Sequence, residues 1–450
     1  IYGTLFCSEC DDVVYDPRFD FVLQQERGRS HVPRTDEATL DAMLMNDATR
    51  ADGTKLPSVC RTPRGLRNMG STCFLNVILQ AFLHNPLLRN YFLSDRHNAA
   101  LCSAGRDCLA CEMDKLFAEF FAGGDRREPY GPTSFLYAIW TDSSSELSQA
   151  GQHDAHEMFI SALNGIHDAL THHAPRRTRL PAFPLDPPDA INQLATHADS
   201  APRASCPCIV HRTFGGMLQS SVTCLHCHEA THTREPFLDL SLEVRADPSR
   251  PDDAFKKRDK KRQATAPTLH ASLARYCAPE HLPDASYKCS HCQTTARVRA
   301  LPATTLTQAT KQLGLLTLPP MLSIQLKVPC TLHTITQRYE NTAKVDTRIQ
   351  FPLHLDMRDC CVAARNEPDE ARDPLAYTYD LLTVVVHEGT LTSGHYTNFS
   401  RWRGQWYRYD DDKVTRVSAS QVLDARAYQL FYLRRRLYNH ASHGLYTSDT

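Results

Sequence analysis

The first third of the chain carries apolar residues at the spacing of helices. One run repeats them every three or four positions, at Phe74, Val77, Ile78, Ala81 and Phe82. This period is typical of a helix with an apolar face, and Pro86 just beyond it predicts where the helix ends. Three further segments show the same period: 111–121, 133–140 and 153–170.

Beyond residue 170 the pattern becomes typical of strands. Proline-rich sequence runs to about residue 205, and apolar and polar residues then alternate, as in 237–244. Short apolar runs between turn residues dominate 312–432, which predicts strands. The segment 245–268 is charged and contains prolines, so we expect a disordered insertion there. Helices first and strands later predict an α+β fold with segregated layers.

The overall composition is that of an ordinary globular protein. The 450 residues are 42% apolar and 22% charged, with a formal net charge of −1. This length exceeds one ordinary domain but allows a large catalytic domain with subdomains. The charge gives no reason to expect nucleic acid or an anionic membrane as a partner. No apolar run approaches the ~20 residues of a membrane helix, and no signal-peptide pattern opens the chain. Since the chain begins on Ile1, with Cys7 and Cys10 close behind, we interpret it as a fragment.

The spacing of the 17 cysteines predicts zinc. Four C-x-x-C pairs begin at Cys7, Cys108, Cys224 and Cys289. A secreted disulfide protein of this length does not usually cluster cysteines in this way with histidines nearby. The clusters therefore indicate zinc in a reducing compartment. The odd total also agrees with one thiol that stays free to attack a substrate.

Cys73 is the candidate nucleophile. It opens the predicted helix of residues 74–82, directly after a turn that contains Gly70. The unpaired N–H groups and the positive end of a helix dipole favour a thiolate there, which predicts a lowered pKa for the Cys73 thiol. The side-chain amide of Asn68 can help those N–H groups to stabilise an oxyanion. The alternative is a buried structural cysteine at the start of a core helix.

His395 is the candidate base, and an aspartate of the run at 410–412 its partner. Gly394-His395-Tyr396 opens a predicted strand, 396–402, that returns after a short turn toward the aspartates. A two-residue turn at 403–404 places Asp410 on the face of His395, whereas a three-residue turn places Asp411 there. A Cys-His-Asp set of this kind is that of nucleophilic catalysis. We expect His387 to be structural.

Three segments resemble the conserved boxes of the ubiquitin-specific proteases, in that family's order, over about residues 64–436. They are the Cys73 segment, the box Gly151-Gln152-His153-Asp154-Ala155-His156-Glu157, and residues 393–411. The resemblance implies a papain-like fold with a helical thumb, a palm and β fingers that grip ubiquitin. It also implies hydrolysis of the isopeptide bond after the C-terminal glycine of ubiquitin. In that family's roles Cys73 is the nucleophile, His395 the base and Asp410 its orienting partner. Asn68 is the oxyanion donor and Asp411 a second support.

The resemblance also sets the domain boundaries that we expect. The chain divides into a zinc-finger remnant, a linker, a catalytic domain and a tail, at 1–20, 21–63, 64–436 and 437–450. The thumb, fingers and palm span about 64–172, 205–312 and 313–436. The sequence departs from the family at Val328-Pro329-Cys330, where an Arg-Phe pair is usual after the palm strand 318–327.

Three four-ligand sets predict three structural zinc ions. The strongest is an S₄ set of Cys224, Cys227, Cys289 and Cys292, which we expect to clip two hairpin tips and which leaves no open coordination position. A second set comprises His97, Cys102, Cys108 and Cys111. A third comprises Cys206, Cys208 and His211, with His167 as the fourth ligand and His172 and His173 as alternatives. For the second and third sets, surface cysteines and histidines without metal are the alternative.

The two further clusters resemble the extra zinc sites of the ubiquitin protease in the SAGA coactivator complex, which acts on monoubiquitylated histone. The segment Leu5-Phe6-Cys7-Ser8-Glu9-Cys10 also resembles the end of that subfamily's ubiquitin-protease zinc finger. This resemblance implies a nuclear protein whose partners are ubiquitin, a nucleosomal histone and the subunits of a SAGA-like module. Two functions of other classes stay open here. One is a catalytically silent, zinc-stabilised ubiquitin-binding scaffold, and the other is a DNA-binding zinc protein, for which a basic face is missing.

Overall fold

The computed structural model describes residues 63–94, 97, 102, 108–121, 128–141, 153–172, 206–244, 267–283, 287–298, 308–327, 348–366, 374–389 and 394–435, and the backbone of 5–7 and 12–14. Most of the predicted linker and insertion, the whole tail, Cys10, His173 and residues 328–330 lie outside these ranges. Pro267 and Thr268, at the end of the predicted insertion, are ordered. The side chain of Thr268 accepts a hydrogen bond from the Ala271 N–H and caps the next helix.

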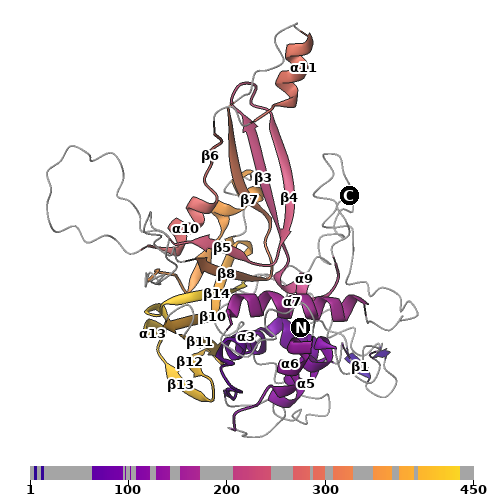
Figure 1. Ribbon diagram of the computed structural model, residues 1–450, viewed down its shortest axis with the longest axis vertical. Coiled ribbons are helices and arrows are strands. Elements are labelled where there is room, and N and C mark those ends of the chain that lie inside the picture. The colour runs from indigo at the N-terminus through magenta and orange to yellow at the C-terminus, as the bar shows by residue number, and fades with distance from the viewer. Residues whose placement is uncertain are drawn as a thin grey trace, which may run out of the picture.

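Helices form one layer of the fold (Figure 1). Those that the sequence predicts are α3 (Cys73–His84), α5 (Leu109–Phe121), α6 (Thr133–Thr141) and α7 (Ala155–His172). The sequence pattern does not predict α4 (Pro86–Leu93) and α9 (Ile209–Phe214). Pro86 follows the end of α3 as expected and is also the first residue of α4. The side chain of Asn85 caps α4 by accepting hydrogen bonds from the N–H groups of Leu87 and Leu88. The central helix α3 is buried on every side.

A mainly antiparallel sheet of eight strands faces these helices. Seven strands lie in the order β13-β12-β11-β10-β14-β8-β5, and β9 also pairs with β10. Their bounds are β5 (Leu240–Glu243), β8 (Met321–Lys327), β9 (His354–Asp356), β10 (Thr378–Gly389), β11 (Gly394–Trp402), β12 (Gln405–Asp410), β13 (Lys413–Val417) and β14 (Ala427–Arg434). Only β5 pairs in parallel, with β8, among the pairings of this sheet that the described residues show.

The sheet separates two apolar cores. On one side Leu382, Val385 and Phe431 pack with the helices of the thumb. On the other side Val384 and Leu430 pack against smaller elements. These elements are α10 (Leu269–Tyr276), η5 (Arg358–Cys360), α12 (Val362–Asn366), η7 (Pro374–Ala376) and α13 (Ala419–Leu423). Because neighbouring residues of β10 and β14 face different cores, both faces of the strands are buried.

A second sheet of four strands projects away from the rest of the molecule (Figure 1). Its order is β4-β3-β7-β6, with β3 (Gly216–Cys224), β4 (Ala230–Phe237), β6 (Glu280–His281) and β7 (Ala309–Thr317). Helix α11 (Ser290–Val298) lies at its far end. The strand-like segment 237–244 is divided between two strands: β4 ends in this sheet at Phe237, and β5 begins in the large sheet at Leu240. Strand β7 also runs past the predicted boundary between fingers and palm.

Near the start of the chain, β1 (Leu5–Cys7) and β2 (Asp12–Val14) pair in antiparallel fashion. In the part of the chain that the structure describes, no helix has the length and apolar character needed to cross a membrane.

Candidate active site and metal centres

Cys73 is the first residue of α3 and is 3% exposed. The loop before it contains two residues with positive φ, Gly70 at 101° and Ser71 at 56°. The backbone N–H groups of Tyr396 and Phe74 lie close enough to the Cys73 sulfur to lower the pKa of its thiol. Since Tyr396 directly follows His395, the candidate nucleophile lies beside the candidate base.

The pKa of the Cys73 thiol is raised from its usual value, so the predicted lowering is wrong for this conformation. Burial is the largest cause, and the nearby Asp411 carboxylate also raises the pKa. The N–H groups of Tyr396 and Phe74 act in the opposite direction, as expected of donors that stabilise a thiolate. The helix start thus has the predicted effect on the sulfur, but loss of hydration outweighs it.

His395 and Asp410 form a hydrogen-bonded pair across the β11–β12 hairpin. The distance from His395 Nε2 to Asp410 Oδ1 is 2.7 Å, and both side chains are partly exposed. Trp402 pairs with Gln405 in this hairpin, which is the register of the two-residue turn. Arg403 and Gly404 form that turn with φ of 51° and 69°, as the favoured two-residue hairpin turns require. With Nε2 on the carboxylate, Nδ1 is the ring nitrogen left for the thiol.

Asp411 has different partners. Its Oδ2 accepts from Asn68 Nδ2 at 2.9 Å, and its Oδ1 accepts from Asn76 Nδ2 at 2.7 Å. The Oδ1 of Asn68 accepts from the N–H groups of Gly70 and Thr72. These bonds fix the orientation of the Asn68 amide, and one of its two N–H groups remains for an oxyanion.

The chain before Asn68 packs tightly against the turn that carries Asp411. The Leu66 N–H donates to the Asp411 carbonyl at 2.9 Å. A Cβ at Gly65 would lie 2.6 Å from the Asp412 carbonyl oxygen and 2.7 Å from that of Asp411. Only glycine therefore allows this approach, which brings together the loop before Cys73 and the aspartates more than 300 residues later.

Several residues of the site have no role in the prediction from sequence. Asn76 is one turn after Cys73 on α3 and stands in the motif, which is the signal that could have identified it. His84 and Tyr409 join α3 to β12 by a 2.8 Å bond between Nε2 and the hydroxyl. No local pattern reveals this pair. His387 lies in β10 and stacks on the Tyr396 ring at 4.2 Å, a packing contact of the kind expected for a structural histidine.

The S₄ set comes together at the far end of the four-stranded sheet. Cys224 Sγ lies 3.8 Å from Cys292 Sγ, and Cys227 Sγ lies 3.5 Å from Cys289 Sγ. Tetrahedral zinc with Zn–S bonds of about 2.3 Å separates its sulfur ligands by about 3.8 Å. The distances therefore fit a shared zinc ion. One predicted feature is wrong. Cys224 is the last residue of β3 and Cys227 lies in the turn after it, but Cys289 directly precedes α11 and Cys292 lies in its first turn, so the second pair is not at a hairpin tip.

The second and third sets also converge, and in each the four ligand atoms lie within 4.8 Å of one another. In the second, His97 Nε2 lies 3.0 Å from Cys111 Sγ and 3.4 Å from Cys108 Sγ. In the third, His167 Nδ1 lies 3.4 Å from Cys208 Sγ and 3.6 Å from Cys206 Sγ, with His211 completing the set. Nitrogen and sulfur ligands of one zinc lie about 3.5 Å apart. These residues can thus hold zinc, and of the candidate fourth ligands His167 is the one that the described structure places at the third site.

Comparison with known proteins decides the family. The sequence model described as ubiquitin carboxyl-terminal hydrolase matches residues 64–432. This chain belongs to the ubiquitin carboxyl-terminal hydrolase family. It is therefore a ubiquitin hydrolase of the cysteine-peptidase class, and the predicted family and fold class are confirmed.

The relatives of this ubiquitin hydrolase include named proteins and solved structures. Ubiquitin carboxyl-terminal hydrolase 22 of Homo sapiens is 32% identical over 471 residues, covering 97% of this chain and 79% of that protein. Ubiquitin carboxyl-terminal hydrolase nonstop of Drosophila melanogaster is 33% identical, covering 96% and 81%. A chain in the SAGA Ubp8/Sgf11/Sus1/Sgf73 DUB module bound to ubiquitin aldehyde is 28% identical with a TM-score of 0.64, covering 97% and 80%.

Proposed function

We propose that this ubiquitin hydrolase cleaves the isopeptide bond after the C-terminal glycine of ubiquitin on a monoubiquitylated histone, as a subunit of a SAGA-like deubiquitinating module in the nucleus. The observation that carries the catalytic part is the His395–Asp410 pair beside the buried sulfur of Cys73. A bonded His–Asp pair next to Tyr396, whose backbone N–H acts on the Cys73 sulfur, argues against a catalytically silent scaffold.

In the proposed mechanism His395 takes the proton of the Cys73 thiol through Nδ1. Asp410 holds the opposite nitrogen, fixes the tautomer and stabilises the imidazolium that forms. The sulfur attacks the carbonyl carbon of the ubiquitin glycine, and the substrate lysine leaves with a proton from His395. Water then hydrolyses the thioester. Asn68, held by Asp411, donates to the oxyanion in both steps.

The proposed partners follow from the solved relatives. Matched structures are of SAGA DUB modules that contain Sgf11, Sus1 and Sgf73, one bound to ubiquitin aldehyde and one to monoubiquitin. We infer that this chain binds ubiquitin and comparable subunits, with the four-stranded sheet as the fingers that grip ubiquitin. We also propose that three zinc ions occupy the three ligand sets and have structural roles, because four protein ligands leave no open position.

Labelling by a ubiquitin C-terminal electrophile tests the catalytic proposal. Wild-type protein should gain one ubiquitin on the tryptic peptide that contains Cys73, detected by mass spectrometry. Cys73→Ala should lose labelling while it still binds monoubiquitin in a pull-down. Undiminished labelling of Cys73→Ala would contradict the assignment of the nucleophile. Release of ubiquitin from monoubiquitylated nucleosomes, compared with an unrelated ubiquitylated protein, separately tests the histone proposal.

A further inference from the structure

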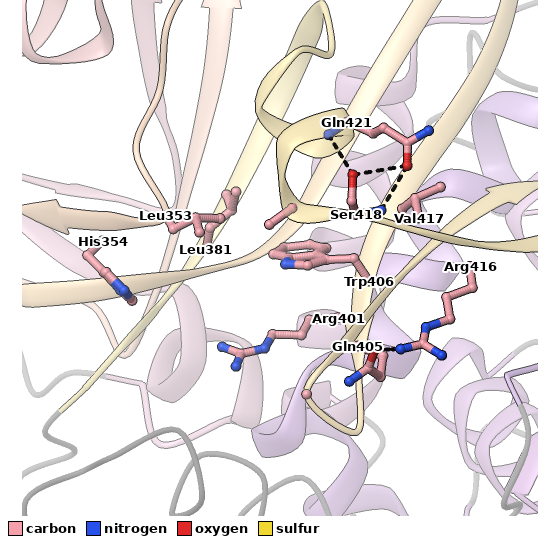
Figure 2. Close-up of a pocket in the computed structure, with 12 residues that line it drawn as sticks. Leu353, His354, Leu381, Arg401, Gln405, Trp406, Arg416, Val417, Ser418 and Gln421 are labelled. Carbon is pink, nitrogen blue, oxygen red and sulfur yellow. Dashed lines mark hydrogen bonds between the residues drawn. The ribbon is translucent and has the colours of Figure 1, made fainter.

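A pocket of about 540 Å³ lies at the turn end of the β11–β12 hairpin (Figure 2). Its walls come from the hairpin, from β10 and the start of β9 with the residue before it, and from β13 with the start of α13. His395 lies near the opposite end of β11. Arg401, which lines the pocket, lies six positions after His395 on β11, and a strand rises about 3.3 Å per residue, so the pocket is about 20 Å from His395. Its volume is within the usual range of ligand sites.

The charged side chains of the pocket are basic. Arg401 and Arg416 line it, and none of its twelve lining residues is an aspartate or glutamate. Arg401 is 7% exposed, so part of its guanidinium is removed from water. Arg416 is exposed and donates to the amide oxygen of Gln405. The nearby Asp380 is outside the lining and is bound by His354 and Arg435.

The remaining lining is mixed: Leu353, Leu381, Trp406, Val417 and Ala419 form an apolar wall, whereas the side chains of His354, Gln405, Ser418 and Gln421 are polar. Figure 2 shows the indole of Trp406 in the middle of the pocket, with Leu353 and Leu381 to one side and Arg416 to the other. A guanidinium makes its strongest hydrogen bonds with carboxylates and phosphates. A carboxylate that replaced the neutral Gln405 oxygen on Arg416 would therefore gain a charge-assisted bond. The aliphatic and indole surfaces would contact an apolar group on the same ligand.

We propose that this pocket binds an acidic segment of a partner protein, with carboxylates on Arg401 and Arg416 and an apolar side chain on Trp406. A free phosphate would leave the apolar wall without a function, and two arginines are few for nucleic acid, which is bound by many phosphate contacts. The solved relatives are assemblies of four proteins, which favours a protein ligand. The proposal does not depend on the catalytic roles, because none of the residues involved belongs to the triad.

Fluorescence anisotropy with a labelled six-residue peptide of alternating glutamate and leucine tests the proposal. The wild-type chain should bind this peptide and not its lysine–leucine counterpart. Arg416→Gln should weaken binding about tenfold, the worth of one charge-assisted hydrogen bond. Arg426→Gln is the matched control, because Arg426 is exposed but lies outside the lining, and it should bind like wild type. Arg401→Gln should also lose binding, with its melting temperature measured to show that it folds.

Turnover of a ubiquitin–fluorophore substrate by Arg416→Gln should equal that of wild type, which separates this site from catalysis. If Arg416→Gln and Arg426→Gln weakened peptide binding equally, the effect would come from net charge alone, and the proposal would be overturned. So would equal binding of the lysine–leucine peptide. A hexaglutamate peptide or millimolar inorganic phosphate that bound as tightly as the glutamate–leucine peptide would show a simple anion site instead, and would overturn the role of the apolar wall.

Discussion

Two adjacent aspartates at the end of β12 have different partners, which separates their proposed roles. Asp410 lies on the strand face of His395 and accepts from its Nε2. Asp411 begins the next turn with a φ of 52°, and its carboxylate turns back to Asn68 and Asn76. In the proposed mechanism, one carboxylate therefore orients His395 and the other orients Asn68, although the two aspartates are adjacent in the chain.

Substitution of each aspartate by asparagine should give three distinct results. Asp410→Asn should be the most severe, since the equivalent change in a serine-protease triad costs about 10⁴ in kcat. Asp411→Asn should lower kcat by about 10²–10³, the effect of losing one oxyanion donor. Asp412→Asn, at an exposed position, should stay near wild type. Steady-state kinetics on a ubiquitin–fluorophore substrate measures all three. If Asp410→Asn kept near-normal turnover while Asp411→Asn lost it, Asp411 and not Asp410 would be the residue that orients His395.

From the sequence alone, Asp410 and Asp411 are almost equally good candidates for the partner of His395, and the reason is physical. The register depends on whether the hairpin turns on two residues or three. A two-residue turn of this type needs positive φ at both positions, which glycine, asparagine and aspartate favour. Gly404 meets that preference, but Arg403 adopts a φ of 51° without any local signal. Cys73 and His395, the proposed nucleophile and base, in contrast stand in local motifs, so the sequence can propose them without knowledge of the turn.

At the scale of elements, the central helix α3 differs from an ordinary amphipathic helix. The apolar period predicted the helix, but its polar residues Asn76, Gln80 and His84 are also buried. Gln80 donates to the Arg64 carbonyl, and His84 bonds Tyr409 of β12. These partners come from distant segments, so a local pattern predicts that the helix exists but not that both of its faces are covered. The same limit explains α11, where a pair of cysteines was predicted in a hairpin.

The burial of the His84 side chain should make the stability of the fold depend on pH. Burial lowers the pKa of His84 from its usual 6.5 to about 4. The unfolded chain therefore binds a proton between these values that the folded chain does not. The stabilisation from neutral His84 is complete above pH 6.5 and is lost as the pH falls toward 4. The loss approaches about 3 kcal/mol, at 1.36 kcal/mol for each pKa unit.

His84→Gln tests this dependence, because glutamine does not titrate. Urea denaturation at pH 7 and pH 4.5 can be followed by tryptophan fluorescence, since Trp402 contacts the His84 ring. Other acid effects, including loss of metal ligands to protons, act on both proteins and cancel in the difference. Wild type should therefore lose more stability on acidification than His84→Gln does. Equal losses would show that His84 does not titrate between folded and unfolded states as inferred.

At the scale of the whole molecule, two of the three ligand sets join segments that the sequence separates widely. The S₄ set links the turn after β3 to α11 at the far end of the fingers. The second set includes Cys108 and Cys111, which are buried at the start of α5. The third links α7 to α9 and borders the thumb core. One set thus lies far from the catalytic residues, whereas the other two lie against the helices that support Cys73.

This arrangement predicts that loss of zinc at different sites has different kinetic effects. Elemental analysis should find three zinc ions per wild-type chain and two in either Cys227→Ser or Cys102→Ser. Structural zinc contributes about 10–16 kcal/mol in small modules, so each loss should unfold the region around its site.

In Cys227→Ser only the fingers should unfold, which should raise KM for a ubiquitin substrate with little change in kcat. In Cys102→Ser the support of α5 should weaken, which should lower the melting temperature and kcat together. One zinc per wild-type chain would refute the two thumb sites, and a matched loss of kcat in both variants would show that the fingers are not separable from the catalytic core.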